Sequence, residues 1–276
     1  MTGKTIIITG ASDGIGAAAA RRLRRGGANV VVVGRTETKA AAVAAELDAD
    51  YFVADYADLS QVRALADKIL SQYPRIDVLA NNAGGMFTKI HHTADGHEAT
   101  FQINYLAPFL LTTQLMDVLV ASRATVINTT SSSQRLLPRG AITKLERTDR
   151  SRPSVAYALT KLAIVLFTRE LHRRYHGSGL AAATFHPGYV ASNFGDASGS
   201  RLLLFGKKYT PSKLFTATVD EGAEQLVWLA SSAPGVDWTP GEYYSKGKIA
   251  KANRAAYDPR LAAELWDHTL AKVQRS

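Results

Sequence analysis

The stretch TIIITGASDGIG, residues 5–16, joins a run of β-branched residues to an alanine- and arginine-rich segment through a glycine-rich turn. Residues 5–9 are predicted to form a strand buried on both faces, and a helix is predicted from about residue 15 to 25. Glycine lets the backbone approach a phosphate closely, and the first turn of a helix offers free N–H groups. The pattern predicts a dinucleotide-binding turn, and the alternative is a tight turn without a ligand. The residues expected to contact the dinucleotide here are Gly10, Ser12, Asp13, Gly14, Ile15 and Gly16.

The alternation of apolar runs and helical segments continues along the chain. Further strands are predicted at 29–33, 51–53, 78–80, 125–128 and 180–185, and further helices at 38–47, 59–72, 99–120 and 155–175. Strictly alternating βαβ units predict an α/β fold, a Rossmann-type doubly wound parallel sheet with helices on both faces. Because the period never resets, we expect a single domain over residues 1–276.

Two long stretches interrupt this rhythm. Residues 131–154 follow the fifth strand and are rich in arginine and proline, and residues 193–218 follow the sixth strand. Long connections in compact domains are often lids or linkers, and α/β sheets bind ligands beyond the carboxyl ends of their strands. We therefore predict a substrate lid at 193–218, the alternative being a surface excursion with its own small core. The apolar run 202–205 within it favours a hydrophobic substrate.

The composition excludes several classes of protein. Hydrophobic residues make up 46% of the 276 and cysteine is absent, which excludes a disordered tail, a disulfide scaffold and a thiolate metal site. Lysine and arginine number 33 against 24 acidic residues, and the net charge of +9 raises the question of nucleic acid or acidic lipid. The arginines of 21–25 are interpreted as a solvated helix face because no aromatic residues interleave with them. No nucleic-acid partner is therefore predicted.

No targeting segment, membrane span or metal site is predicted. The most apolar later stretch, residues 105–121, contains Pro108, Gln114 and Asp117 and falls short of the roughly 20 apolar residues that span a bilayer. We expect a buried helix there, no membrane partner and a cytoplasmic location. The histidines of the chain cluster without the carboxylates that would frame a metal site.

The end of the second predicted strand bears on the choice of dinucleotide. About 20 residues beyond the glycines, folds that bind NAD place an acidic residue on the ribose 2′-hydroxyl. Here Gly34 carries no carboxylate, and Arg35 has a guanidinium suited to a 2′-phosphate. The sequence therefore predicts NADP(H) in preference to NAD(H). Lys39 is interpreted as a solvated helix position rather than a second phosphate ligand, and a Glu37 that turned inward would weaken the prediction.

Tyr157 and Lys161 stand four residues apart in the predicted helix 155–175, so both side chains lie on one face of it. A tyrosine with a pKa near ~10 is a poor acid or base at neutral pH, and a neighbouring ammonium lowers that pKa. Alone, such a pair is typical of an ordinary exposed helix face. Together with the glycine-rich turn, the pair predicts acid–base chemistry beside a dinucleotide.

These features resemble the short-chain dehydrogenase/reductase family over nearly the whole chain. The resemblance rests on residues 9–16, on Asn81–Gly84 after the fourth strand, and on the spacing of Tyr157 and Lys161. It implies four catalytic residues, namely Asn104, Ser131, Tyr157 and Lys161. It also implies contacts with the cofactor from Asp55, Asn82, Ala83, Gly84, Tyr157, Lys161, Pro187, Gly188, Val190 and Ser192.

Shorter motifs are similar to the retinol-dehydrogenase-like branch of that family. Residues 93–98 resemble its TADGxE motif, and residues 161–171 resemble its KLANVLFTREL segment. The step of 26 residues from Ser131 to Tyr157 is similar to its long insertion. We expect no membrane anchor of the kind that several branch members carry. The chain departs from the family pattern at Thr130, Ile164 and Ser192.

The resemblance implies hydride transfer between a nicotinamide and the carbonyl or alcohol carbon of a small-molecule substrate. Tyr157 would give or take the proton, Lys161 would lower the pKa of Tyr157 and bind the nicotinamide ribose, and Ser131 would hydrogen-bond the carbonyl oxygen. Asn104 would hold a water that links Lys161 to solvent. The alternative is a non-catalytic regulator that senses NADP(H) on the same fold. The family also implies a homodimer or homotetramer formed through the helices predicted at 99–120 and 155–175.

Overall fold

The strands of the computed structural model form one eight-stranded sheet, and the structure describes residues 1–138, 140–189 and 217–274. In space the strands follow the order β3-β2-β1-β4-β5-β6-β7-β8. Neighbouring strands from β3 to β7 are parallel, and β8 runs antiparallel to β7. The strands are β1 Thr5–Thr9, β2 Asn29–Gly34, β3 Asp50–Val53, β4 Val78–Asn81, β5 Thr125–Thr129, β6 Ala181–His186, β7 Tyr243–Ser245 and β8 Lys248–Ile249.

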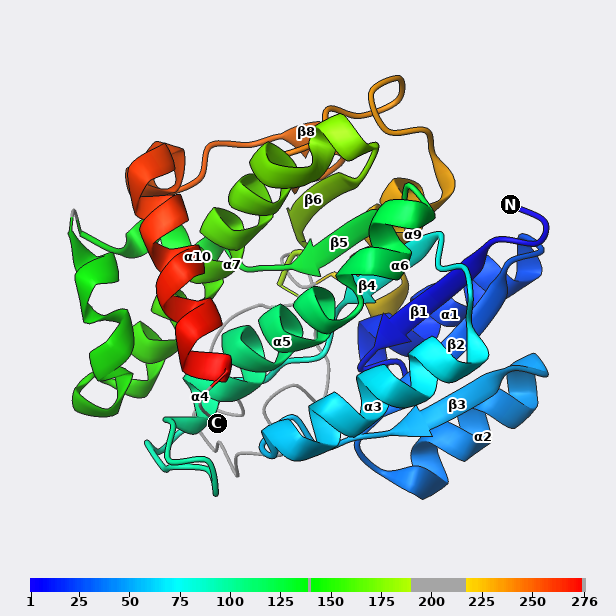
Figure 1. Ribbon diagram of the computed structural model, residues 1–276, viewed down its shortest axis with the longest axis horizontal. Coiled ribbons are helices and arrows are strands. Elements are labelled where there is room, and N and C mark those ends of the chain that lie inside the picture. Colours follow the sequence, from blue (N-terminus) through cyan, green and yellow to red (C-terminus); the bar gives the residue numbers. More distant parts are fainter. Residues whose placement is uncertain (139, 190–216, 275–276) are drawn as a thin grey trace.

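Helices cover both faces of this sheet (Figure 1). They are α1 Gly14–Arg25, α2 Glu37–Leu47, α3 Leu59–Gln72, α4 Ala99–Phe101, α5 Ala107–Gln114, α6 Met116–Ala121, α7 Pro153–Tyr175, α9 Val219–Ser231 and α10 Pro259–Val273. Side chains of β1 alternate between the layers: Ile7 joins the core under α3, α5, α7 and α10, and Ile6 and Ile8 join the core under α1, α2 and α9. Burial on both faces explains the continuous apolar runs and confirms the predicted doubly wound sheet.

The chain reverses its direction across the sheet at the centre. It builds outward from β1 through β2 to β3, and then crosses back to add β4 on the other side of β1. Open α/β sheets bind their ligands beyond the carboxyl ends of the strands at such a reversal. The glycine-rich turn follows β1, and Asn82 follows β4. The topology therefore brings two of the predicted cofactor motifs to one crevice.

The helix predicted over 99–120 is interrupted. It consists of α4, a π-helical turn at Gln102–Leu106, α5 and α6. The N–H of Ala107 bonds to the carbonyl of Gln102, five residues back, which is the spacing of a π-helix. Pro108 has no N–H to return to the carbonyl of Asn104, so the regular α-helical pattern cannot run through this point. The expectation of one unbroken helix is wrong here, and Pro108 is the signal for the interruption.

Other differences lie in the connections and near the C-terminus. Residues 131–154, expected as a long loop, contain the 3-10 helical segments Ser132–Leu136 and Ala141–Arg150. The helices α9 and α10 and the short strands β7 and β8 were not predicted. Three and two residues are too few to show a period, so sequence pattern alone cannot identify such strands. Residues 193–216 of the predicted lid lie outside the described residues.

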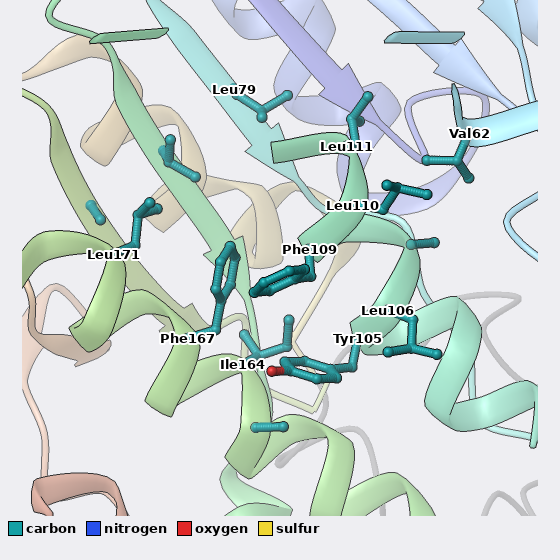
Figure 2. Close-up of a cluster of buried hydrophobic side chains, with 14 of the residues drawn as sticks. Val62, Leu79, Tyr105, Leu106, Phe109, Leu110, Leu111, Ile164, Phe167 and Leu171 are labelled. Atoms are coloured by element: carbon teal, nitrogen blue, oxygen red, sulfur yellow. The ribbon is translucent and has the colours of Figure 1, made fainter. Parts of the chain in front are cut away.

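The apolar stretch 105–121 lies inside the protein, as expected. Leu106, Leu110 and Leu111 are buried in the core shared with α3 and the sheet, and Figure 2 shows Leu110 and Leu111 near Val62 of α3. Of the described helices, none has both the length and the hydropathy that crossing a bilayer would require.

An aromatic cluster joins α5, α7 and α10. Figure 2 shows Phe109 of α5 pointing toward Phe167 of α7, and the centroids of the two rings lie 5.2 Å apart. Trp266 of α10 stacks on Phe167 at 5.6 Å and meets Phe109 edge-on at 5.1 Å. All three rings are buried. The cluster therefore fixes the spacing between α7, which carries Tyr157 and Lys161, and the helices α5 and α10.

Candidate active site

The four predicted catalytic residues come together beyond the carboxyl ends of β4 and β5. Ser131 follows β5, Tyr157 and Lys161 lie on α7, and Asn104 lies in the π-helical turn. Lys161 Nζ is 5.5 Å from the centroid of the Tyr157 ring, and Tyr157 hydrogen-bonds with Ser131. A Cβ atom added to Gly84 would lie 2.5 Å from Asn104 Oδ1 and 3.4 Å from Lys161 Nζ. The backbone at Gly84 is therefore the point where Asn104 and Lys161 approach each other.

Burial dominates the acidity of Tyr157. Loss of solvation raises the pKa of the phenol above its usual value, and the hydrogen bond with Ser131 acts in the opposite direction. Lys161 Nζ donates a hydrogen bond to Thr129 O at 3.2 Å, and the predicted lowering of the Tyr157 pKa by this ammonium stays a prediction. Tyr157 is therefore a neutral phenol at pH 7, and a neutral phenol can donate a proton.

Burial also acts on Lys161, whose side chain is 3% exposed. It lowers the pKa of the ammonium from 10.5 to about 8. The carbonyl of Lys161 accepts a hydrogen bond from Thr130 Oγ1 at 2.7 Å, while its Nζ donates to the neighbouring Thr129 O. Two consecutive residues at the end of β5 thus hold both the backbone and the amine of Lys161. In the sequence, Thr130 stands out only as a departure from the family pattern, and nothing there indicates this role.

The side chain of Asn104 is held by three hydrogen bonds. Its Nδ2 donates to Gly85 O at 2.8 Å and to Thr100 O at 2.9 Å, and its Oδ1 accepts the N–H of Gly85 at 3.0 Å. The residue is buried. Because π-helical turns are frequent at functional sites, the placement of Asn104 in one fits a role in the site. The predicted role in holding a water stays a prediction.

The glycine-rich turn forms a cradle that has no room for side chains. Gly10 has a φ of +66°, and a Cβ atom on it would lie 2.8 Å from Ala83 Cα. A Cβ atom on Gly16 would lie 2.3 Å from Gly10 O. Asn82 Nδ2 donates to the last carbonyl of β1 at 3.1 Å and so ties β4 to the turn. With Ile15 and Gly16 in the first turn of α1, whose N–H groups have no helical partner, the cradle fits a pyrophosphate.

Ser12 and Asp13 form the rim of this cradle. Asp13 caps α1, since its Oδ1 accepts the N–H of Gly14 at 2.7 Å, and its Oδ2 pairs with Lys39 Nζ at 3.1 Å. A Cβ atom on Gly34 would lie 2.7 Å from Ser12 Cβ. A side chain at position 34 would therefore collide with Ser12 of the cradle. Gly34 also leaves the end of β2 without a carboxylate.

Two cations flank the rim. Arg35 directly follows β2, and its side chain is exposed beside the contact between Gly34 and Ser12. Lys39 is exposed on α2, in agreement with its interpretation as a solvated helix position, and its ammonium pairs with Asp13 at 3.1 Å. Positive charge at the rim of a dinucleotide cradle favours an additional phosphate group there.

The remaining predicted cofactor residues lie at the same edge of the sheet where the structure describes them. Asp55 follows β3, and its Oδ1 accepts a backbone N–H two residues further on at 2.9 Å. Pro187 and Gly188 follow β6, and Gly188 has a φ of +92°. Val190 and Ser192 lie outside the described residues, so their contacts stay predictions.

Sequence reasoning missed a chain of hydrogen bonds between side chains beneath the site. Asn81 Nδ2 donates to Thr112 Oγ1 and to Asn128 Oδ1, both at 2.9 Å, and Asn128 Nδ2 donates to Thr168 Oγ1 at 2.9 Å. All four residues are buried. The chain crosses β4 and β5 and links α5 to α7. An asparagine in each of two apolar strands is the signal for it, because buried amides need partners.

Comparison with known proteins agrees with this arrangement. The family described as short chain dehydrogenase matches residues 4–202. A candidate daunorubicin C-13 ketoreductase from Streptomyces sp. (strain C5) is 37% identical over 281 residues, covering 99% of this chain and 93% of that protein. Retinol dehydrogenase 14 from Homo sapiens is 35% identical, covering 97% and 85%. The crystal structure of an uncharacterized Mycobacterium paratuberculosis protein matches with a TM-score of 0.77 and 30% identity, covering 99% of this chain and 94% of that one.

The parallel sheet, the glycine cradle at its reversal and the cluster of polar side chains beside it define a Rossmann-type enzyme. The family match over residues 4–202 and the sequence identity with the ketoreductase and retinol dehydrogenase identify the family within this class of enzymes. The chain belongs to the short-chain dehydrogenase/reductase family and is an oxidoreductase, and its relatives include retinol dehydrogenases, as the sequence resemblance predicted.

Proposed function

We propose that this protein is an NADP(H)-dependent oxidoreductase that interconverts an aldehyde or ketone and the corresponding alcohol. The proposal is carried by the convergence of Asn104, Ser131, Tyr157 and Lys161 beside the glycine cradle. A non-catalytic sensor of NADP(H) would need the cradle but would have no use for this set of side chains. The candidate ketoreductase among the relatives supports a carbonyl substrate.

In the reaction proposed here, Tyr157 donates its phenolic proton to the carbonyl oxygen of the substrate. Ser131, which already hydrogen-bonds with Tyr157, donates to the same oxygen and stabilises the charge that develops on it. The ammonium of Lys161 favours the phenolate that Tyr157 becomes after it gives up its proton. When bound, the nicotinamide cofactor supplies the hydride that the carbonyl carbon receives.

The two directions of the reaction require Tyr157 in different protonation states. Its raised pKa keeps the phenol protonated at neutral pH, which is the form that a general acid needs. Oxidation of an alcohol would require Tyr157 to lose this proton before it can act as a base. Both directions of the reaction therefore belong to the proposed function.

The choice of NADP(H) rests on the rim of the cradle. Arg35 and Lys39 provide positive charge, and Gly34 offers no carboxylate to a ribose 2′-hydroxyl. An arginine can bind a phosphate through two parallel hydrogen bonds, which gives it an advantage there over a neutral side chain. Preference for NADP(H) over NAD(H) is part of the proposal.

Several further expectations belong to the same proposal. They are a hydrophobic substrate under a lid at 193–218, a single domain over 1–276, a cytoplasmic location, and no nucleic-acid partner. Of the lid, only residues 217 and 218 are described. Ala217 donates its N–H to Tyr189 O at 2.9 Å, so the chain re-enters the described part beside the end of β6.

The proposal is tested by following NADPH consumption with a panel of aldehydes, ketones and retinals, and by identifying the alcohol products. We expect reduction of at least one class of carbonyl, with NADPH preferred to NADH. Tight NADPH binding without consumption in the presence of any carbonyl would instead support the sensor. Equal or tighter binding of NADH would contradict the cofactor preference.

A further inference from the structure

The segment TADGHE, residues 93–98, contributes nothing to the site described above, although it directly precedes the helical segment that carries Asn104. Its backbone forms a compact turn in which Thr93 N donates to His97 O at 2.9 Å. The carboxylate of Glu98 caps α4, since its two oxygens accept N–H groups of the first turn at 2.9 and 3.0 Å. The segment therefore sets where the helix begins.

Two side chains of this segment also hold the first residue of the π-helical turn, Gln102. Thr93 Oγ1 donates to Gln102 Oε1 at 2.6 Å, and Gln102 Nε2 donates to Asp95 Oδ2 at 2.7 Å. The same Nε2 donates to Tyr56 O at 3.2 Å, and Asp95 Oδ2 also accepts the N–H of Leu59 at the start of α3, at 2.9 Å. We call Thr93, Asp95 and Gln102 the clasp.

The clasp holds the polar side chain of Gln102 at a buried position, where an apolar side chain would pack equally well. Gln102 is 0% exposed, and its amide bonds to Thr93 and Asp95 of the clasp and to the backbone carbonyl of Tyr56. A buried amide that loses a partner carries the full cost of its desolvation. The position of Gln102, and with it the start of the π-helical turn, is therefore fixed by three directional contacts.

The other end of the π-helical turn is anchored independently. Thr269 Oγ1 of α10 donates its hydrogen to Leu265 O at 2.6 Å, so Tyr105 OH is the donor in the 2.9 Å bond between Tyr105 and Thr269. Figure 2 shows the buried ring of Tyr105 in the core. Asn104 lies between the two anchors and accepts the N–H of Gly85 at 3.0 Å.

We propose that the clasp is a positioning site that holds Asn104 in place for the reaction. It also joins the catalytic turn to the connection after β3, because Gln102 bonds to the carbonyl of Tyr56, which directly follows Asp55, a predicted cofactor contact. The catalytic part of this inference rests on the proposed function. Its structural part does not rest on the proposed function. The N–H of Gly85 bonds to Asn104 Oδ1, so its rate of hydrogen exchange reports the position of Asn104 in the absence of any reaction.

The test compares Thr93→Val, which removes the hydroxyl at nearly constant volume, with Thr93→Ser, which keeps it. We expect Thr93→Val to speed hydrogen exchange of the Gly85 amide about tenfold and to lower kcat about tenfold, with the KM for NADPH changed less than about threefold. Thr93→Ser should restore both quantities. Thr113→Val is the matched control, since that hydroxyl bonds only to carbonyls of its own helix among the contacts described, at 3.0 Å.

A second pair of variants, Asp95→Ala and Asp95→Asn, makes the same comparison, because the asparagine oxygen can still accept from Leu59 and Gln102. If Asp95→Ala does not fold, Thr93→Val decides the matter. Unchanged Gly85 exchange in Thr93→Val, or an equal loss in Thr113→Val, would overturn the proposal. If the wild type reduces no carbonyl, the proposed function fails, and the exchange measurement still decides whether the clasp positions Asn104.

Discussion

Lys161 is the residue whose ionisation should set the upper pH limit of activity. Burial lowers its pKa to about 8, so its ammonium is lost as the pH rises through that value. The phenolate formed when Tyr157 donates its proton then loses the neighbouring positive charge. We expect kcat/KM for carbonyl reduction with NADPH to fall above about pH 8. A profile that stays flat from pH 7 to pH 10 would contradict a role for this ammonium.

Arg35 is the residue that should select the cofactor. In Arg35→Ala, we expect the KM for NADPH to rise about ten- to a hundredfold, as for the loss of a hydrogen bond to a charged group, with little change for NADH. Steady-state kinetics with both cofactors measure the difference. Arg25→Ala removes the same charge from an exposed site at the end of α1 and serves as the control. A similar loss for both cofactors would show that Arg35 does not recognise the 2′-phosphate.

At the scale of elements, the connection from β4 to α4 must approach Asn104 without a side chain. In Gly84→Ala, the new Cβ atom would lie 2.5 Å from Asn104 Oδ1, so Asn104 has to move. At the adjacent Gly85, the nearest atom to a new Cβ is the tip of Phe87 at 3.9 Å, an ordinary contact. We expect Gly84→Ala to lose about tenfold or more in kcat and Gly85→Ala to lose much less. Equal kinetics for the two variants would contradict the close approach.

The elements differ in how well the sequence predicts them. The helix at 59–72 and the strand at 5–9 are found where their apolar periodicity places them, because each buries a continuous stripe or run. The π-helical turn around Asn104 is not found this way, since its interruption arises from one missing N–H at Pro108 and from contacts of Gln102 with distant residues. The raised pKa of Tyr157 is likewise a consequence of burial, which the spacing of Tyr157 and Lys161 does not report.

The site residues also fall into those that the sequence identifies and those that only the structure shows. A motif identifies a residue such as Ser131 by its place after a strand, and the structure then supplies its partner, Tyr157. The hydroxyls and amides that hold the catalytic side chains, such as Thr130 and Asn128, have no motif of their own. Their partners lie 31 and 40 residues away in the sequence, so only the folded chain brings them together.

At the scale of the whole molecule, α10 packs on α5 and α7, which lie within the helical stretches through which the family implies association. Trp266 packs on Phe109 and Phe167, and Arg174 pairs with Asp267 at 2.9 Å. The structure therefore gives the helices α5 and α7 a partner from the same chain. The homodimer or homotetramer implied by the family stays a prediction, and light scattering at micromolar concentration measures the oligomeric state. We expect a dimer or tetramer, and a monomer at this concentration would contradict that expectation.

The same packing makes α10 important for stability. Trp266 is buried, and replacing a buried tryptophan by alanine costs about 3–5 kcal/mol. Trp266→Ala should lower the free energy of unfolding by about this amount, which denaturant titration measures. Val236→Ala, at a residue that is 83% exposed, is the control and should change it by less than about 0.5 kcal/mol. A small effect of Trp266→Ala would show that α10 is loosely attached.

The central claim is that Tyr157 donates the proton in carbonyl reduction. Tyr157→Phe removes one hydroxyl from a half-buried ring and leaves the glycine cradle and Arg35 intact. With the carbonyl substrate found in the screen, this variant should lose about a hundredfold to ten-thousandfold in NADPH consumption. Its dissociation constant for NADPH, measured by fluorescence titration, should stay within about threefold of the wild-type value. Turnover retained at the wild-type rate with unchanged NADPH binding would contradict the account.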